Sequence, residues 1–312
     1  MEQPIIRLEG VTKQRRHKTI GPIDLSLPKG YVYGLIGENG SGKSTLIHML
    51  LQTVFPDAGR ISWFGQSYSK GIPSEVRREI GYVAEKSNLE EDNLTAEEAA
   101  SFRAYWYPGW DQPYFEKLCD QFQVPKGTRL RKMSKGERRK YEIAAALAPH
   151  PKLLLLDEPS SGLDPFAWKM MIEVLRECLQ TEDTTIVLST HIIDEVKRLA
   201  DYVMLIHHGK WMGMAEKDSL LDNWKEVWAV CPAADLEDLP NIVQMQQESH
   251  GVTRVVTTSC RELEQILYDS GINVLKTRAL ELDEILSLWV QGYKPAGVQE
   301  GEEQIHGTIK TS

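Results

Sequence analysis

The sequence predicts an α/β fold whose core is a parallel sheet, with an antiparallel β portion and a helical insert. Short apolar runs lie at residues 31–36, 80–83, 153–156, 185–189 and 202–206. The run at 153–156 is four consecutive leucines, which is typical of a strand buried on both faces of a parallel sheet. A glycine-rich turn joins the first run to a helical pattern at 45–51. This strand–loop–helix order favours an α/β arrangement.

The turn itself carries the clearest chemistry. Residues 37–44 read GENGSGKS, a complete match to the phosphate-binding loop (Walker A) pattern G-x-x-x-x-G-K-[ST]. Glycines let the backbone amides and the helix N-terminus approach an anion closely. Lys43 is expected to reach the β- and γ-phosphates, and the Ser44 hydroxyl to hold Mg²⁺. The expected nucleotide-binding residues of this loop are Gly37, Glu38, Asn39, Gly40, Ser41, Gly42, Lys43, Ser44 and Thr45.

Two carboxylates end the four-leucine strand. Asp157 is placed to hold Mg²⁺ with Ser44, as the second acidic motif of phosphate-loop enzymes does. Glu158 follows it and is expected to act as general base on the attacking water, a role worth roughly 10²–10⁴-fold in rate. A solvent-exposed acidic pair would be the simpler interpretation of these residues alone, but the phosphate loop favours the catalytic one.

A capped helix precedes this strand. Ser134 and Glu137 form an S-x-x-E capping box, and an alanine-rich amphipathic stretch follows. These residues are explained by a well-capped helix alone. The same helix N-terminus is also able to present Ser134, backbone amides and its dipole to a second phosphate group.

The order of motifs decides between these interpretations. Five motifs follow one another along the chain: the phosphate loop, the capped Ser-x-Gly helix, Leu-Leu-Leu-Leu-Asp-Glu, Ser161-Gly-Leu-Asp164 and Ser189-Thr-His191. In this order they resemble the ATP-binding cassette (ABC) ATPases over roughly residues 4–215. The resemblance implies a P-loop NTPase (RecA-like) core, ATP and Mg²⁺ as ligands, and ATP hydrolysis. It implies that two cassettes close head to tail over two ATP molecules. By that likeness, Ser134, Lys135, Gly136 and Glu137 form the signature, Asp164 ends the D-loop, and His191 contacts the γ-phosphate.

Three positions depart from the family pattern. Glu85 stands where the family has glutamine, and its carboxylate is still able to coordinate Mg²⁺ or a water. Lys135 and Glu137 replace the usual glycine and glutamine of the signature. Lys135 could contact phosphate as a point charge or extend into solvent. The aromatic residue that stacks on adenine is missing near residues 15–17, where Arg15, Arg16 or His17 could stack instead.

Composition favours a cytoplasmic enzyme subunit. The chain has 312 residues with 36 Lys and Arg against 45 Asp and Glu, a net charge of −9. This acidic balance argues against a nucleic-acid partner. The four cysteines form no C-x-x-C pair, as expected of reduced thiols without a metal site. No run approaches 18 apolar residues, and the start MEQPIIRLEG lacks signal-peptide regions.

We expect three parts along the chain. Residues 1–215 form the ATP-binding domain, with a helical subdomain at about 86–149. Its parallel-sheet core is expected to contain strands near residues 5–8 and at the apolar runs above. The expected helices of the subdomain include a capped start at Thr95 and the stretch 114–122. Residues 216–296 form a small α/β accessory domain like the C-terminal extension of drug- and bacteriocin-type export cassettes. Its strands are expected at 226–230, 252–257 and 272–276, and its helices at 261–268 and 282–290. The polar tail 297–312 is expected to be disordered.

Two classes of function fit these features. The first is the ATP-hydrolysing subunit of an ABC membrane transporter, an exporter, with its permease on another chain and a homodimer or a related cassette as partner. Such a subunit would lie at the inner face of the cell membrane. The alternative is a soluble ABC-type ATPase in translation or DNA maintenance. The single cassette, with neither a coiled coil nor zinc cysteines between Lys43 and Asp157, favours the transporter.

The densest aromatic stretch, Tyr105-Trp-Tyr-Pro-Gly-Trp110, lies in the expected helical subdomain. In the family this region borders the groove that receives a short cytoplasmic helix of the permease, and aromatic residues often anchor such contacts. The alternative is that these rings form the small core of the helical subdomain. The turn implied by Pro108-Gly109 favours the core.

Overall fold

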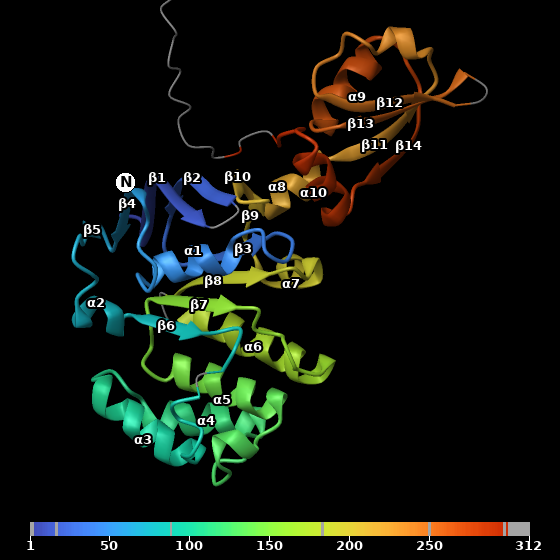
Figure 1. Cartoon of the computed structure of the whole chain (residues 1–312). Coiled ribbons are helices and arrows are strands. Elements are labelled where there is room, and N and C mark those ends of the chain that lie inside the picture. Colours follow the sequence, from blue (N-terminus) through green and yellow to red (C-terminus); the bar gives the residue numbers. More distant parts are fainter. Residues whose placement is uncertain are drawn as a thin grey trace, which may run out of the picture. The chain divides into compact units, whose positions relative to one another are not determined.

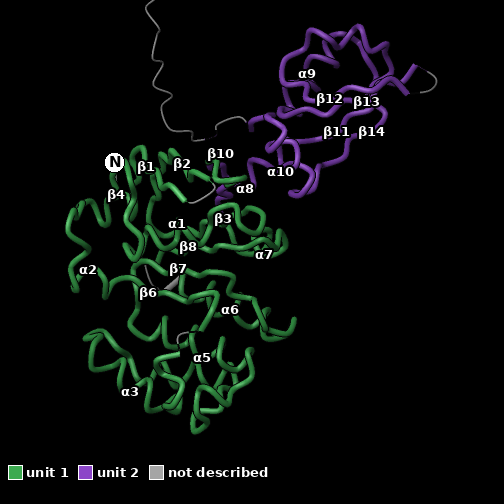
Figure 2. The backbone as a smooth tube through the Cα atoms, in the orientation of Figure 1, with its two compact units in different colours: residues 1–200, 206–211, 300–312 green, residues 201–205, 212–299 purple. Residues whose placement is uncertain are grey.

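A computed structural model describes residues 3–15, 18–87, 89–181, 184–248, 251–295 and 298 (Figure 1). The chain divides into two compact units (Figure 2). The first holds residues 1–200 and 206–211, and the second holds residues 201–205 and 212–299. Among the described residues, no helix combines the length and the apolar character needed to cross a membrane. The tail expected to be disordered lies outside the described residues apart from Val298.

A six-stranded sheet carries the functional site at the carboxyl ends of its parallel strands. Its order is β10 (Lys210–Glu216), β9 (Tyr202–His207), β3 (Val32–Ile36), β8 (Thr185–Thr190), β7 (Leu153–Asp157) and β6 (Ile80–Val83). The pairs β3–β8, β7–β8 and β6–β7 are parallel. Every residue of β3, β7 and β8 is buried, as their continuous apolar runs predict. The predicted α/β class with a parallel core is confirmed.

A second sheet of the first unit is antiparallel, in the order β2 (Lys18–Leu27), β1 (Ile6–Arg15), β4 (Ala58–Trp63) and β5 (Gln66–Ser67). The expectation that residues 5–8 belong to the parallel core is therefore wrong. Burial alternates at the start of β1, where Ile6 and Leu8 are buried and Arg7 and Glu9 are exposed. A strand with one solvated face belongs in an antiparallel sheet rather than in a parallel sheet covered on both sides.

Helices cover the six-stranded sheet. These are α1 (Lys43–Leu50), α2 (Ser74–Arg78), α6 (Pro165–Thr181) and α7 (Ile193–Leu199). Helix α1 packs against β7 and β8, and α7 packs against β3 and β8. The approach of α7 depends on Gly34, where a Cβ atom would lie only 2.8 Å from Val196 Cγ1.

The helical insert contains α3 (Ala96–Trp106), α4 (Gln112–Phe122), a short 3-10 helix (Leu130–Lys132) and α5 (Lys135–Leu147) (Figure 1). Thr95 and Glu98 form a complete capping box at the start of α3. Ser134 and Glu137 form another at the start of α5. Both caps agree with the sequence prediction, because each side chain satisfies an amide that has no partner within the helix.

The second unit contains an antiparallel sheet in the order β12 (Ile242–Gln247), β13 (Thr253–Thr257), β11 (Lys225–Ala229) and β14 (Val274–Ala279). Its helices are α8 (Lys217–Asn223), α9 (Cys260–Asp269) and α10 (Leu282–Val290), with a 3-10 turn at Ala233–Asp235. Apolar residues of β11, β13, α9 and the segment that follows β11 form its core, namely Val227, Ala229, Cys231, Leu236, Val255, Cys260, Leu263 and Leu267. Strand β12 was not predicted, because half of its sequence IVQMQQ is glutamine and it contains no continuous apolar run.

A buried acid crosslinks this second sheet. The Glu226 side chain accepts hydrogen bonds from Arg254 Nε at 2.8 Å and Arg278 Nε at 2.6 Å. Arg278 also donates to both carboxylate oxygens of Glu284 at 2.9 Å. Burial alone would raise the pKa of Glu226, but the hydrogen bonds from Arg278 and Arg254 outweigh it, and the pKa is lowered.

Candidate functional site

The phosphate-binding loop connects β3 to α1. Gly42 precedes α1 with φ +123°, a conformation that favours glycine. At Gly37 a Cβ atom would lie 2.2 Å from the carbonyl oxygen of Ile206, so no side chain fits there. Lys43 is 5% exposed, and its Nζ donates to the Gly37 carbonyl oxygen at 2.7 Å. The lysine is thus folded back over the loop, and its ammonium group lies where the loop amides surround an anion.

The ends of β7 and β8 bring oxygen ligands to the first turn of α1. Ser44 Oγ donates to Asp157 Oδ1 at 3.3 Å, and Ser189 Oγ donates to the same oxygen at 2.6 Å. Asp157 is 2% exposed. Hydroxyl and carboxylate oxygens are the donors that Mg²⁺ prefers. Ser189 was not singled out from the sequence for this role, because a serine inside a buried strand carries no local signal of its partner.

Glu158 lies between a lysine and a histidine. Its Oε1 is 3.5 Å from Lys43 Nζ, and its Oε2 is 2.8 Å from His191 Nδ1. Its backbone has φ +49°, a left-handed conformation that is strained for a residue with a side chain. The Glu158 amide donates to the Ser189 carbonyl oxygen at 2.9 Å, which fixes the turn. The carboxylate is therefore turned toward the phosphate loop rather than into solvent.

Of these groups, Lys43, Ser44, Glu158 and His191 line one cavity of about 460 Å³, and Asp157 contacts it through Ser44. Its lining residues are Lys18, Asn39, Gly40, Gly42, Lys43, Ser44, Thr45, Glu85, Glu158, Ser161 and His191. Glu85 enters from the segment after β6, with an exposed side chain. Its carbonyl oxygen accepts a hydrogen bond from Arg139 Nη2 of α5 at 2.8 Å, and the Ala84 carbonyl oxygen accepts one from Arg139 Nη1. A side chain of α5 thus holds the segment that carries Glu85.

The expected signature residues do not line this cavity, although Lys135 contacts Ser161, which does. Lys135 Nζ donates to Ser161 Oγ at 2.7 Å, and a Cβ atom on Gly136 would lie 2.8 Å from the Gly162 carbonyl oxygen. Ser134 is exposed, and its side chain with that of Glu137 caps α5. Within one chain the start of α5 therefore packs beside residues 161 and 162 and does not reach the phosphate loop.

Asp164 and Arg15 also do not line the cavity. Asp164 Oδ1 accepts from the amides of Phe166 and Ala167 at 2.9 Å, so in this chain it caps the start of α6. These hydrogen bonds lower the pKa of the Asp164 carboxyl, and the bond from the Ala167 amide has the largest effect. Of the residues considered for adenine stacking, Arg15 lies at the exposed end of β1, while Arg16 and His17 lie outside the described residues.

The parallel sheet, the phosphate loop and the carboxylates at the strand ends define a P-loop nucleotide-binding enzyme. Sequence comparison matches residues 20–161 to the family described as ABC transporter. The bacitracin transport ATP-binding protein BcrA of Bacillus licheniformis is 30% identical over 289 residues, 87% of this chain and 92% of that protein. BcrA of Enterococcus faecalis is 34% identical over 208 residues, 66% of this chain and 67% of that protein.

Solved structures agree. A structure described as the ATP-binding subunit of an ABC transporter has a TM-score of 0.63 and 28% identity, and covers 70% of this chain and 92% of that one. The chain belongs to the ABC transporter family, as an ATP-binding subunit with ATPase activity. The predicted resemblance to bacterial export cassettes of the drug and bacteriocin type is confirmed.

Proposed function

We propose that this chain hydrolyses ATP to drive an export system whose membrane permease is a separate chain. The observation that carries the proposal is the convergence of Lys43, Ser44, Glu158 and His191 on one cavity, with Asp157 hydrogen-bonded to Ser44 behind it. Its relatives are named for bacitracin transport, for Nod factor export and for daunorubicin and doxorubicin resistance. These names support outward transport but differ in their cargo, so the proposal stops at export and names no cargo.

Each residue around the cavity has a distinct role in this proposal. Lys43 leaves the Gly37 carbonyl and binds the terminal phosphates. Ser44 and Asp157 would hold Mg²⁺, with Glu85 beside them, and the ion would neutralise phosphate charge. Glu158 accepts a proton from the attacking water. His191 now contacts Glu158 at 2.8 Å, and it would bind the γ-phosphate when nucleotide is present.

The position of the signature supports a dimer of cassettes. Ser134, Lys135 and Gly136 lie beside Ser161 and not in the cavity of their own chain. An exposed, capped helix N-terminus is suited to bind phosphate, so this one would serve the ATP of a second cassette. In a homodimer each of the two sites would have its own Glu158 and His191. The simplest assembly is therefore a head-to-tail homodimer with two working sites.

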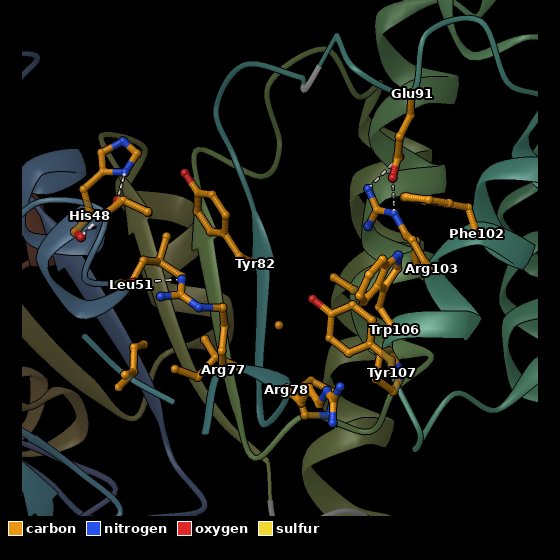
Figure 3. Close-up of a pocket in the computed structure, with 18 residues that line it drawn as sticks. His48, Leu51, Arg77, Arg78, Tyr82, Glu91, Phe102, Arg103, Trp106 and Tyr107 are labelled. Atoms are coloured by element: carbon orange, nitrogen blue, oxygen red, sulfur yellow. Dashed lines mark hydrogen bonds and ion pairs between the residues drawn. The ribbon is translucent and has the colours of Figure 1, made fainter. Parts of the chain in front are cut away.

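A separate cavity supports docking of the permease. It has a volume of about 530 Å³, and Arg77, Arg78 and Tyr82 lie across it from Trp106 and Tyr107 of the α3 end (Figure 3). Both arginines are exposed. We infer that its occupant is a short cytoplasmic helix of the permease that carries apolar side chains and an acidic group, since aromatic anchors and cations line the same groove. Such docking would hold the chain at the inner face of the membrane.

The exposure of the aromatic stretch agrees with this inference. Tyr105 is 82% exposed and Trp106 is 51% exposed. The expectation that these rings form the core of the helical insert is therefore wrong for both, because α3 buries mainly its alanines at 96, 99 and 100. Trp110 is half-buried and packs on Phe115, with ring centroids 5.3 Å apart. It belongs to the packing of α4 instead.

Two measurements test the proposal. Lys43→Ala should lose nucleotide binding and ATPase activity, and a variant that hydrolyses ATP at the wild-type rate would refute the assigned site. The partner is tested by whether a polytopic membrane protein co-purifies with this chain. Trp106→Ala should weaken that complex while melting temperature and ATP binding stay unchanged. Tyr268→Ala, which removes another exposed aromatic ring in the second unit, is the control. Co-sedimentation with ribosomes in place of a permease would favour the translation alternative.

A further inference from the structure

The turn between β9 and β10 has an unusual composition. Strand β9 ends at His207, β10 begins at Lys210, and His208-Gly209 connects them. His208 has φ +49° and Gly209 has φ +86°. Positive φ at both central residues is the requirement of a type I′ turn, whose first central position usually holds asparagine, aspartate or glycine. In a regular strand the side chains of His207 and His208 would point to opposite faces. Here the turn brings the ring centroids to 4.1 Å.

This turn is held beside the phosphate loop. The Gly21 amide donates to the Gly209 carbonyl oxygen at 2.9 Å, and a Cβ atom on Gly209 would lie 2.3 Å from the Thr19 carbonyl oxygen. Glu38, the second residue of the phosphate loop, faces the turn. Its Oε2 lies 4.0 Å from His208 Nε2. One ligand atom each from Glu38, His207 and His208 lies within 4.8 Å of the others.

We propose that Glu38, His207 and His208 form a binding site for one Zn²⁺ ion. Two imidazoles and a carboxylate are a donor set that suits zinc, with water as the fourth ligand. Zinc–ligand bonds of about 2.0–2.2 Å place tetrahedral ligands roughly 3.4 Å apart, so the three groups need to close by about an ångström. The side chains of His208 and Glu38 are 76% and 69% exposed, which leaves them free to make this adjustment. An exposed His–Glu ion pair at 4.0 Å would by itself contribute little.

The site touches the phosphate loop without using its catalytic groups. The Glu38 carbonyl oxygen accepts hydrogen bonds from the Ser41 amide at 2.9 Å and from Lys43 Nζ at 3.4 Å. Its side chain points instead to His208. Zinc would therefore join the backbone that cradles phosphate to the β9–β10 turn. Neither His207 nor His208 lines the nucleotide cavity, so the site is additional to the one for ATP hydrolysis.

The test uses the full chain without a histidine tag, free of nucleotide, at about pH 7.5, where histidines are mostly neutral. Zinc binding is measured by calorimetry in excess Mg²⁺, which occupies the oxygen-ligand site at Ser44 and Asp157 but competes poorly for imidazoles. His208→Asn removes a ligand while retaining a residue that tolerates the left-handed turn. Glu38→Gln removes the charged ligand at constant size. His150→Asn is the matched control, because His150 also has φ +50° and also pairs with a carboxylate, that of Asp111 at 3.1 Å.

We expect the wild type to bind one Zn²⁺ and to melt at a higher temperature in its presence. Loss of second-shell partners typically weakens metal binding about 10–100-fold, and loss of a direct ligand should cost at least as much. His208→Asn and Glu38→Gln should therefore bind zinc at least about tenfold more weakly, while His150→Asn binds it like the wild type. Zinc binding that is unchanged in His208→Asn, or equally weakened in His150→Asn, would overturn the site. Equal melting temperatures of wild type and His208→Asn without zinc would show that the fold is retained.

Discussion

Replacement of Glu158 by glutamine isolates the proposed proton-accepting role of this carboxylate. The change keeps the size of the side chain and removes its charge. Glu158 does not position the main groups expected to hold ATP and Mg²⁺. Lys43 is held by the Gly37 carbonyl oxygen at 2.7 Å, and Ser44 is held by Asp157 at 3.3 Å. Two groups proposed to bind phosphate lose a charged partner, Lys43, whose Nζ lies 3.5 Å from Glu158, and His191, whose Nδ1 lies 2.8 Å from it. Freed of that carboxylate, Lys43 should bind phosphate at least as well.

The expected loss is therefore in turnover alone. A general base contributes about 10²–10⁴-fold, which corresponds to about 3–5 kcal/mol of activation free energy at 1.36 kcal/mol per tenfold. We expect kcat to decrease by about 10²–10⁴-fold and ATP affinity to stay within about threefold of the wild type. An ATP-bound dimer should accumulate and be detected by size-exclusion chromatography. Glu79→Gln, which removes a surface ion pair with Lys152 at 3.0 Å, is the control for the loss of a Lys–Glu pair. A Glu158→Gln enzyme that hydrolyses ATP near the wild-type rate would refute the base assignment.

Three further changes test other parts of the molecule. Glu85→Gln should keep ATPase activity within about tenfold while shifting its Mg²⁺ titration or its stimulation by the permease, because both side chains offer an oxygen and differ by one charge; unchanged titration and stimulation would make Glu85 an ordinary loop residue. Glu226→Gln should lower the unfolding free energy of the second unit by about 2–3 kcal/mol near neutral pH, as charge-assisted hydrogen bonds from two arginine side chains are lost. Because folding lowers the pKa of Glu226, this stability is present above the unfolded-state pKa and is lost as pH falls through the folded-state pKa. If calorimetry shows the same acid sensitivity in the wild type and in Glu226→Gln, this prediction is contradicted. Gly136→Ala should reduce ATPase activity without loss of nucleotide binding, since its Cβ would meet the Gly162 carbonyl oxygen at 2.8 Å; full activity would mean that this close approach is unimportant.

Continuous apolar runs located the parallel core well. The strand predicted at 153–156 from four leucines is observed at Leu153–Asp157, because such a run fits a strand covered on both faces. Where the run was short or mixed, the prediction failed. The start of β1 was assigned to the core although its burial alternates, and β12 was missed because its pairing with β13, not its own sequence, makes it a strand. Such pairing depends on residues far away in the sequence.

The candidate site shows the same division. Asp157, Glu158 and His191 follow parallel strands, so their convergence could be expected from the rule that such strands end at one edge of the sheet. The approach of Ser189 to Asp157 could not, since it depends on the register between β8 and β7. The pairing of His207 with His208 could not either, because it results from a positive φ angle that sequence periodicity does not report.

Helix α5 has a geometric property that concerns timing. Its first residue, Lys135, contacts Ser161, while Arg139, one turn later, holds the carbonyl oxygens of Ala84 and Glu85. A helix of 13 residues behaves as a rigid rod over one turn. Any tilt of α5 at the surface proposed to meet a second cassette would therefore shift the Glu85 segment of its own cavity in the same instant. In such a dimer, a change at the contact with the second cassette and a change in the position of Glu85 would therefore occur together.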